Sequence, residues 1–343
     1  MATKEVAINQ DIRAYVPQED RIQVRFLRDV IIGHEQPLLK LWRQQGATVQ
    51  SLNSLSVSET PFPVPPKSVQ KEIINYCSDK VSAIDQSISA VNSLKKSLDE
   101  KRVTQIWEEI THSKPTDKER YETEIPWLGM IPEDWGVAKI GWKYDIQLGK
   151  MLDESEIVGD NLEPYLRNKD VQWWEINTED LPQMDFTEQE KSKYQLKEGD
   201  ILVCEGGEAG RSAIWEGSDQ EILYQKALHR VRPRNSEQVP EFFCYFMEFA
   251  VKKDIFSSKT NQSTIEHVTV EKLSNQEIPV PPYEQQKEIV SRLSNTVEKI
   301  ESAKANLDRI ETLLEEKRQA LITAAVTGQI DMSKEKGVTQ GDD

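Results

Sequence analysis

The chain has 343 residues, and its 43 Lys and Arg against 59 Asp and Glu give a formal net charge of -16. This length predicts two domains, and the acidic balance argues against nonspecific attachment to nucleic acid or to an anionic membrane. The sequence has no apolar run of about 18 residues, no targeting signature at the amino terminus, and three cysteines without metal-ligand spacing. These features predict a cytoplasmic protein with free thiols, no membrane partner, no metal and no cofactor.

Residues 1–62 read as a small, incomplete α/β domain. Val6–Ile8 and Ile12–Val16 suggest strands, Asp20–Leu41 suggests a helix, and a last strand region starts at Gly46. The sequence Pro63-Val-Pro-Pro follows, and its proline pair favours an extended entry and then the first turn of a helix. Residues 63–111 are therefore predicted to form a first long helix.

Residues 112–124 form a polar linker, and residues 125–282 are predicted to be a complete second domain. Strands are expected at Asp200–Cys204 and Ser212–Trp215, joined by a glycine-rich turn, and Phe242–Phe256 is expected to be an amphipathic helix. Residues 283–328 follow as a second long helix, and residues 329–343 as a flexible tail.

Both long helices carry apolar residues in alternating steps of four and three. That spacing is typical of a coiled coil, and we expect the two helices to pack antiparallel within one chain. The wider pattern also includes Leu94 and Ile310. The predicted seam residues are Ile73, Ile84, Val91 and Leu98 in the first helix, and Ile289, Leu293, Ile300, Leu307 and Leu314 in the second.

The two helices and the segments before them look like copies of one ancestral unit. Pro63-Val-Pro-Pro aligns with Pro279-Val-Pro-Pro, 216 positions later, and Gln10–Pro17 corresponds to Gln225–Pro233. Residues 1–62 match only the later part of the second domain, so the counterpart of residues 125–220 is absent from the first copy.

Taken together, these motifs resemble the DNA-specificity subunits of type I restriction–modification systems. The resemblance rests on Trp127-Leu-Gly-Met-Ile-Pro-Glu-Asp-Trp, Gly199-Asp-Ile-Leu with Gly206–Gly210, the Pro279 motif, and Glu316-Lys-Arg with Thr327-Gly-Gln-Ile. It implies an α+β fold: target recognition domains of mixed α/β structure, separated by two long antiparallel coiled-coil helices and related by a pseudo-twofold internal repeat. It also implies double-stranded DNA, methyltransferase (modification) subunits and a restriction/translocase subunit as partners, with catalysis in those partners. The incomplete first domain adds a second copy or a complementary half-subunit as a further expected partner.

Two local motifs suggest enzymes, but a structural role explains each better. Val280-Pro-Pro-Tyr283 resembles the catalytic loop of amino-methyltransferases, yet valine cannot hydrogen-bond a target amino group, and we interpret the motif as a helix entry. Glu205–Ser212 resembles a phosphate-binding loop but has Arg211 in place of the lysine, and a hairpin turn accounts for it better.

DNA contact requires basic side chains for phosphates and for guanine, and amides for adenine. The candidates in the second domain are Lys150, Arg167, Asn168, Lys169, Arg211, Lys226, Arg230, Arg232 and Asn261. Adjacent Trp173 and Trp174 are interpreted as core residues.

The leading hypothesis is a non-catalytic, sequence-reading subunit whose helices space the recognition domain and dock methyltransferase subunits. The alternative is an acidic coiled-coil adaptor or DNA mimic of the restriction complex that reads no sequence. It is favoured by 17 Lys and Arg against 29 Asp and Glu in residues 125–282, a balance of about -12 that opposes approach to phosphates. An enzyme is the third hypothesis, and no nucleophile or metal cluster in the sequence supports it.

Overall fold

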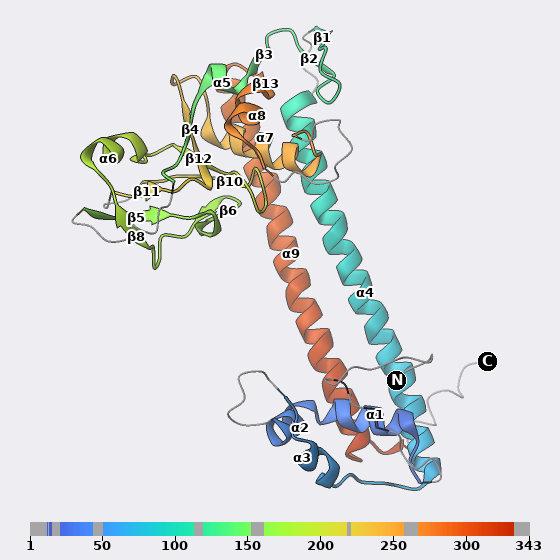
Figure 1. Cartoon of the computed structure of the whole chain (residues 1–343). Coiled ribbons are helices and arrows are strands. Elements are labelled where there is room, and N and C mark those ends of the chain that lie inside the picture. The colour runs from blue at the N-terminus through green and yellow to red at the C-terminus, as the bar shows by residue number, and fades with distance from the viewer. Residues whose placement is uncertain are drawn as a thin grey trace. The chain divides into compact units, whose positions relative to one another are not determined.

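The computed structural model describes residues 12, 14–15, 21–43, 51–112, 119–151, 161–217, 221–256 and 267–332. The chain divides into two compact units: unit 1, residues 1–97 and 302–343, and unit 2, residues 98–301. Helices α4 (Lys67–His112) and α9 (Tyr283–Val326) each contribute one part to unit 1 and the other to unit 2 (Figure 1). None of the helices in the described ranges is long and apolar enough to cross a membrane.

Unit 2 is built around a four-stranded sheet in the order β10-β9-β12-β4, in which every neighbouring pair is antiparallel. A second sheet has the order β11-β5-β8, and three two-stranded pairs, β1-β2, β13-β3 and β6-β7, complete the described strands. The strands are β1 (Arg120–Glu122), β2 (Met130–Pro132), β3 (Gly136–Lys139), β4 (Tyr144–Leu148), β5 (Leu162–Leu166), β6 (Val171–Gln172), β7 (Glu175–Ile176), β8 (Gln183–Asp185), β9 (Ile201–Cys204), β10 (Ser212–Ile214), β11 (Leu223–Tyr224), β12 (Leu228–Pro233) and β13 (Glu277–Val280). The helices of unit 2 besides α4 and α9 are α5 (Ile140–Lys143), the 3-10 helix η2 (Asn168–Asp170), α6 (Glu188–Tyr194), α7 (Pro240–Lys252) and α8 (Val270–Asn275).

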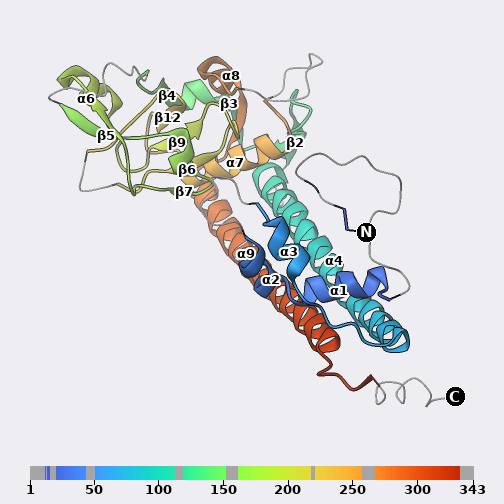
Figure 2. The ribbon, with the colours of Figure 1, turned by 60° about the horizontal axis from the view of Figure 1, so that its bottom comes forward.

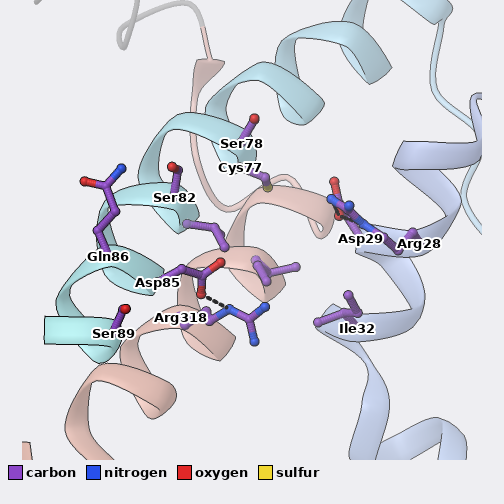
Figure 3. A pocket seen from close by; sticks show the side chains of 12 residues that line it. Arg28, Asp29, Ile32, Cys77, Ser78, Ser82, Asp85, Gln86, Ser89 and Arg318 are labelled. Carbon is purple, nitrogen blue, oxygen red and sulfur yellow. Dashed lines mark hydrogen bonds and ion pairs between the residues drawn. The ribbon is translucent and has the colours of Figure 1, made fainter. Parts of the chain in front are cut away.

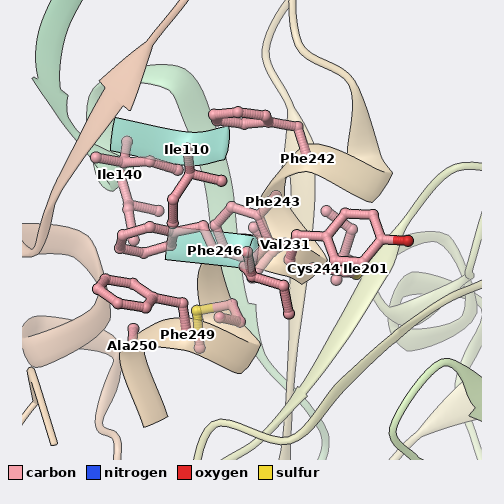
Figure 4. Close-up of a cluster of buried hydrophobic side chains, with 14 of the residues drawn as sticks. Ile110, Ile140, Ile201, Val231, Phe242, Phe243, Cys244, Phe246, Phe249 and Ala250 are labelled. Carbon is pink, nitrogen blue, oxygen red and sulfur yellow. The ribbon is translucent and has the colours of Figure 1, made fainter. Parts of the chain in front are cut away.

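Strand β9 is buried on both faces, as expected for a strand between two hydrophobic layers. Ile201 and Val203 face a core formed with α7, whereas Leu202 and Cys204 face a second core formed with β5, β8 and β11. Figure 4 shows the first of these cores, in which α7 contributes Phe242, Phe243, Phe246 and Phe249. The expected strands and the turn between them are confirmed, since β9 and β10 pair antiparallel across residues 205–211.

Unit 1 contains α1 (Val24–Gly33), α2 (Glu35–Trp42), α3 (Ser54–Glu59), the first part of α4 and the last part of α9. The prediction of a single helix over Asp20–Leu41 is wrong, because the helix is interrupted at His34, between α1 and α2. Pro37 has no N–H to donate to the Gly33 carbonyl, which instead accepts a hydrogen bond from Thr323 Oγ1 at 2.7 Å. The strands expected at Val6–Ile8 and from Gly46, and most of the one at Ile12–Val16, lie outside the described residues.

The long helices run antiparallel in both units and lie side by side in Figures 1 and 2. In unit 1, Lys95 pairs with Glu311 at 2.5 Å and Asp85 with Arg318 at 3.0 Å. In unit 2, Arg102 pairs with Glu301 at 2.7 Å, and Glu109 pairs with Arg292 at 2.7 Å. Higher numbers on one helix meet lower numbers on the other in each unit, which defines the antiparallel arrangement.

The line of contact between α4 and α9 differs from the expected one at one position on each helix. Leu94 is 55% exposed, and Ile310 on α9 is 44% exposed, so their expected place in the seam is wrong. The covered positions lie one residue later, at Lys95 and Glu311, because these side chains pair across the helices. Of the remaining seam candidates, Ile73, Ile84, Val91, Ile289, Leu293 and Ile300 are buried, and Leu98, Leu307 and Leu314 are half-buried.

The internal repeat is visible in hydrogen bonds. Gln286, 1% exposed, accepts from the backbone N–H of Val239 at 3.0 Å and donates to the carbonyls of Glu237 at 3.0 Å and Pro281 at 2.8 Å. Gln70, 216 positions earlier and fully buried, makes the same three bonds to Gln23 at 2.8 Å, Arg21 at 3.0 Å and Pro65 at 2.8 Å. All three partners also differ by 216, so the same local structure is built twice.

Candidate nucleic-acid interface

Four loops of unit 2 meet at one edge of the main sheet: residues 149–151, 167–170, 205–211 and 225–227. Backbone hydrogen bonds join them, from Lys226 N–H to the Lys150 carbonyl at 2.7 Å and from Glu205 N–H to the Ala227 carbonyl at 2.9 Å. The side chain of Asn168 donates to the Gly206 carbonyl at 3.0 Å. The loops therefore form one surface, which we call the loop edge.

Glycine allows two of these loops to touch. A Cβ atom at Gly149 would lie 2.4 Å from the Gln225 carbonyl oxygen, closer than real contacts allow. The loop edge therefore depends on a residue without a side chain at this position.

Two basic candidates are buried behind the loop edge. Lys150 is 6% exposed; its Nζ donates to the Asp185 carbonyl at 2.8 Å and forms an ion pair with Glu190 at 3.0 Å. Arg230 is 5% exposed and pairs with Asp145 at 2.6 Å. Both were expected to face DNA, and their burial corrects that expectation, because an ammonium or guanidinium group inside a fold is held by carboxylates.

The Lys150 pair also changes the acidity of its partner. Burial by itself raises the pKa of Glu190, but hydrogen bonds from Thr187 and Lys150 outweigh this effect and lower the pKa below its ordinary value. Glu190 is therefore ionised when it meets Lys150, and the pair stabilises the folded domain.

Three further arginine candidates are half-buried and form ion pairs or hydrogen bonds within unit 2. Arg167 pairs with Asp170 at 2.7 Å, and Arg232 pairs with Asp200 at 2.5 Å, which raises the pKa of both guanidinium groups. Arg211 donates to the Asn168 carbonyl at 2.9 Å and to its side-chain oxygen at 3.2 Å. Arg167 and Arg211 therefore fix the loop edge, whereas Arg232 pairs at the opposite end of the sheet, before β9.

Lys169 and Lys226 are the two basic candidates with exposed side chains, and both belong to the loop edge. Asn261 lies outside the described residues. Sequence reasoning did not single out Met151, which is 63% exposed beside Lys150. No charge or motif signals that position; only the meeting of the loops does.

Trp173 and Trp174 form the turn between β6 and β7, and both pack against the α7 core as expected. Trp174 has a positive φ of 65°, packs against Tyr245 with ring centres 4.3 Å apart and ring planes inclined by 51°, and donates its indole N–H to Glu248 at 2.9 Å. Glu248 also accepts two hydrogen bonds from Arg102. The hairpin tip is thus anchored to α7.

Two kinds of side chain in the described residues bear on chemistry, the cysteine thiols and the potential metal ligands. Burial raises the pKa of the Cys77 and Cys204 thiols to about 11, which favours the protonated form of both near neutral pH. The described ranges contain no group of three or more His, Cys, Asp or Glu side chains able to hold a metal ion.

A family model described as "Type I restriction modification DNA specificity domain" matches residues 132–312, more than half of the chain. The chain belongs to this family. The type I restriction enzyme MjaVIII specificity subunit of Methanocaldococcus jannaschii is 24% identical over 302 residues, which cover 83% of this chain and 66% of that protein. The EcoBI specificity subunit of Escherichia coli is 20% identical over 331 residues, which cover 94% of this chain and 69% of that protein.

This member of the specificity family thus spans about two thirds of the length of those relatives. A solved structure titled for complex assembly and conformational transition of the type I R-M system matches with a TM-score of 0.68. That alignment covers 90% of this chain and 72% of the other at 17% sequence identity, and it shows a shared fold.

Proposed function

We propose that the chain is a non-catalytic specificity subunit that reads one part of a DNA target through unit 2 and docks methyltransferase subunits along α4 and α9. Family membership supports the sequence-reading role over the acidic adaptor. A restriction/translocase subunit would join the same complex. Residues 1–62 serve as a partial recognition domain and residues 125–282 as a complete one.

The observation that carries the proposal is the loop edge. Specific readers place side chains on loops that a rigid scaffold holds in register. Here backbone hydrogen bonds and the side chains of Asn168 and Arg211 join four such loops, while Lys169 and Lys226 stay exposed.

Lys150, Arg230 and Arg232 are each paired with a carboxylate inside unit 2, so they leave the net charge of residues 125–282 unchanged at about -12. The approach to phosphates therefore depends on local exposed lysines, of which Lys169 and Lys226 lie on the loop edge.

The test is DNA binding by the chain together with its methyltransferase subunits, measured on cognate and random duplexes over a range of salt concentrations. If Lys169 and Lys226 contact phosphates, each replacement by Ala should lower the slope of log K against log salt by about 1 and weaken binding to all sequences alike. Lys197→Ala is the matched control, since this exposed lysine precedes β9 at the end opposite the loop edge.

Equal slopes for the Lys169→Ala, Lys226→Ala and Lys197→Ala variants would place the DNA surface elsewhere. Inhibition of the methyltransferase complex without any sequence preference would instead favour the adaptor function.

A further inference from the structure

Unit 1 contains a cavity of about 630 Å³ between α1, α4 and α9. Figure 3 shows Asp29 and Ile32 from α1 facing Ser82 and Asp85 from α4, with Arg318 from α9 paired to Asp85. The lining combines polar side chains with apolar ones from Ile32, Val81 and Ile322, which suits a partner that brings both an apolar surface and a hydrogen-bond donor.

Asp29 identifies the missing interaction. It is 2% exposed, and its Oδ1 accepts two hydrogen bonds from Arg28, at 2.8 and 2.6 Å. Its Oδ2 is buried and accepts no hydrogen bond from any residue that the structure describes. A buried carboxylate oxygen that accepts no hydrogen bond lowers the stability of the fold. An N–H or O–H group of a partner in the cavity would remove this cost by donating to Asp29 Oδ2.

The internal repeat shows what fits. Adding 216 to Ile32 and Asp29 gives Glu248 and Tyr245 in unit 2. Trp174 covers both: its indole packs against Tyr245 with ring centres 4.3 Å apart and donates its N–H to Glu248 at 2.9 Å. The aromatic tip of the β6–β7 hairpin therefore fills, in unit 2, the position that corresponds to the cavity of unit 1.

The ion pair beneath this position is also repeated. Arg102–Glu301 in unit 2 and Arg318–Asp85 in unit 1 are related by the same offset of 216. The floor of the two positions is therefore equivalent, while the first repeat has no counterpart of residues 125–220, which include the hairpin.

We propose that this cavity is a docking site for a tryptophan-tipped β-hairpin on a separate polypeptide. The indole ring would lie on Ile32 and donate its N–H to Asp29 Oδ2, one helical turn before the acceptor position used in unit 2. A second copy of this chain fits less well, because its own Trp174 is already held by Tyr245 and Glu248. The inference concerns unit 1 and does not depend on DNA reading by unit 2.

The test uses the full chain with a duplicate of residues 119–224 joined ahead of Gln10, where the repeat places it. Tethering raises the effective concentration of the inserted hairpin at the cavity to about the millimolar range, so even weak docking becomes measurable. Hydrogen exchange followed by mass spectrometry should show amides of α1 (Val24–Gly33) exchanging about tenfold more slowly than in the parent.

Two changes should each restore the parental exchange rate: Ser82→Arg, which blocks the cavity, and Trp174→Ala made in the inserted copy alone. Ser93→Arg, an exposed position on α4 outside the cavity, should leave the slow exchange intact. Neither serine is buried, so both arginine variants of the unextended chain should exchange like the parent.

The proposal is overturned if α1 exchanges at the parental rate in the extended chain, or if slow exchange persists with Ser82→Arg. An inserted segment that remains unprotected throughout has not docked on unit 1 and overturns it equally. Self-association of the unextended chain in sedimentation, abolished by Ser82→Arg, would assign the cavity to a second copy instead.

Discussion

The repeated glutamine gives the sharpest test of how the fold is stabilised. Gln286→Leu keeps a side chain of similar size at a 1% exposed site but removes three hydrogen bonds, to Val239, Glu237 and Pro281. Each lost bond leaves a backbone group short of a partner, at about 1–2 kcal/mol. The sum predicts a loss of roughly 3–6 kcal/mol in the free energy of unfolding of unit 2.

The same change at Gln70 should cost less, about 1–3 kcal/mol, because water can reach its bonds more readily. All three Gln70 bonds are only partly buried, whereas two of the three Gln286 bonds are fully buried. Gln86→Leu is the control, an exposed glutamine on the same helix as Gln70, and should change stability by less than about 0.5 kcal/mol.

Native-state hydrogen exchange in increasing urea reads the two units separately, through amides of α1 and α7. Gln286→Leu should lower protection in α7, and Gln70→Leu should lower it in α1. The reasoning fails if Gln286→Leu costs no more than Gln86→Leu, or if either change weakens α1 and α7 equally.

Three other changes have defined outcomes. Burial lowers the pKa of His229 in the folded state below its ordinary value of about 6.5. The unfolded chain therefore binds a proton at His229 more readily than the folded chain, so the contribution of His229 to stability is complete above about pH 6.5 and is lost as the pH falls below it. The urea midpoint should drop more between about pH 7.5 and 5.5 in the parent than in His229→Gln. Lys150→Met should lower the melting temperature, because it leaves the partly exposed Glu190 without its ion-pair partner, while DNA binding by the folded fraction keeps its salt slope. Val91→Asp buries a charge in the seam and should cost several kcal/mol in a circular dichroism melt, whereas Leu94→Asp, at a 55% exposed position, should cost almost none.

Long-period patterns carried most of the fold information in the sequence. The heptad spacing and the 216-residue offset predicted two long antiparallel helices, observed as α4 and α9. The choice between Leu94 and Lys95 as the inner position could not be read from spacing, since steps of three and four are equally regular. The partner helix decides it, through Glu311.

The loop edge shows the same limit of prediction from sequence. Basic residues were found in the sequence, but their roles depend on carboxylates far away along the chain: Glu190 lies 40 positions from Lys150, and Asp145 lies 85 positions from Arg230. Only the folded sheet brings these groups together. A charged residue in a strand or loop therefore indicates a binding surface only after its internal partners are known.

The Lys95–Glu311 pair has a consequence for the ancestry of the molecule. The two residues are 216 positions apart, so each is the duplicate of the other, and they meet where the two copies cross. A single ancestral helix pairing with its own twin would have brought identical side chains together there, lysine against lysine or glutamate against glutamate, and like charges repel. Once duplication joined the copies in one chain, the two positions were free to acquire opposite charges. Because lysine meets glutamate, α4 should prefer α9 of its own chain over α4 of another molecule, where Lys95 would face a second lysine.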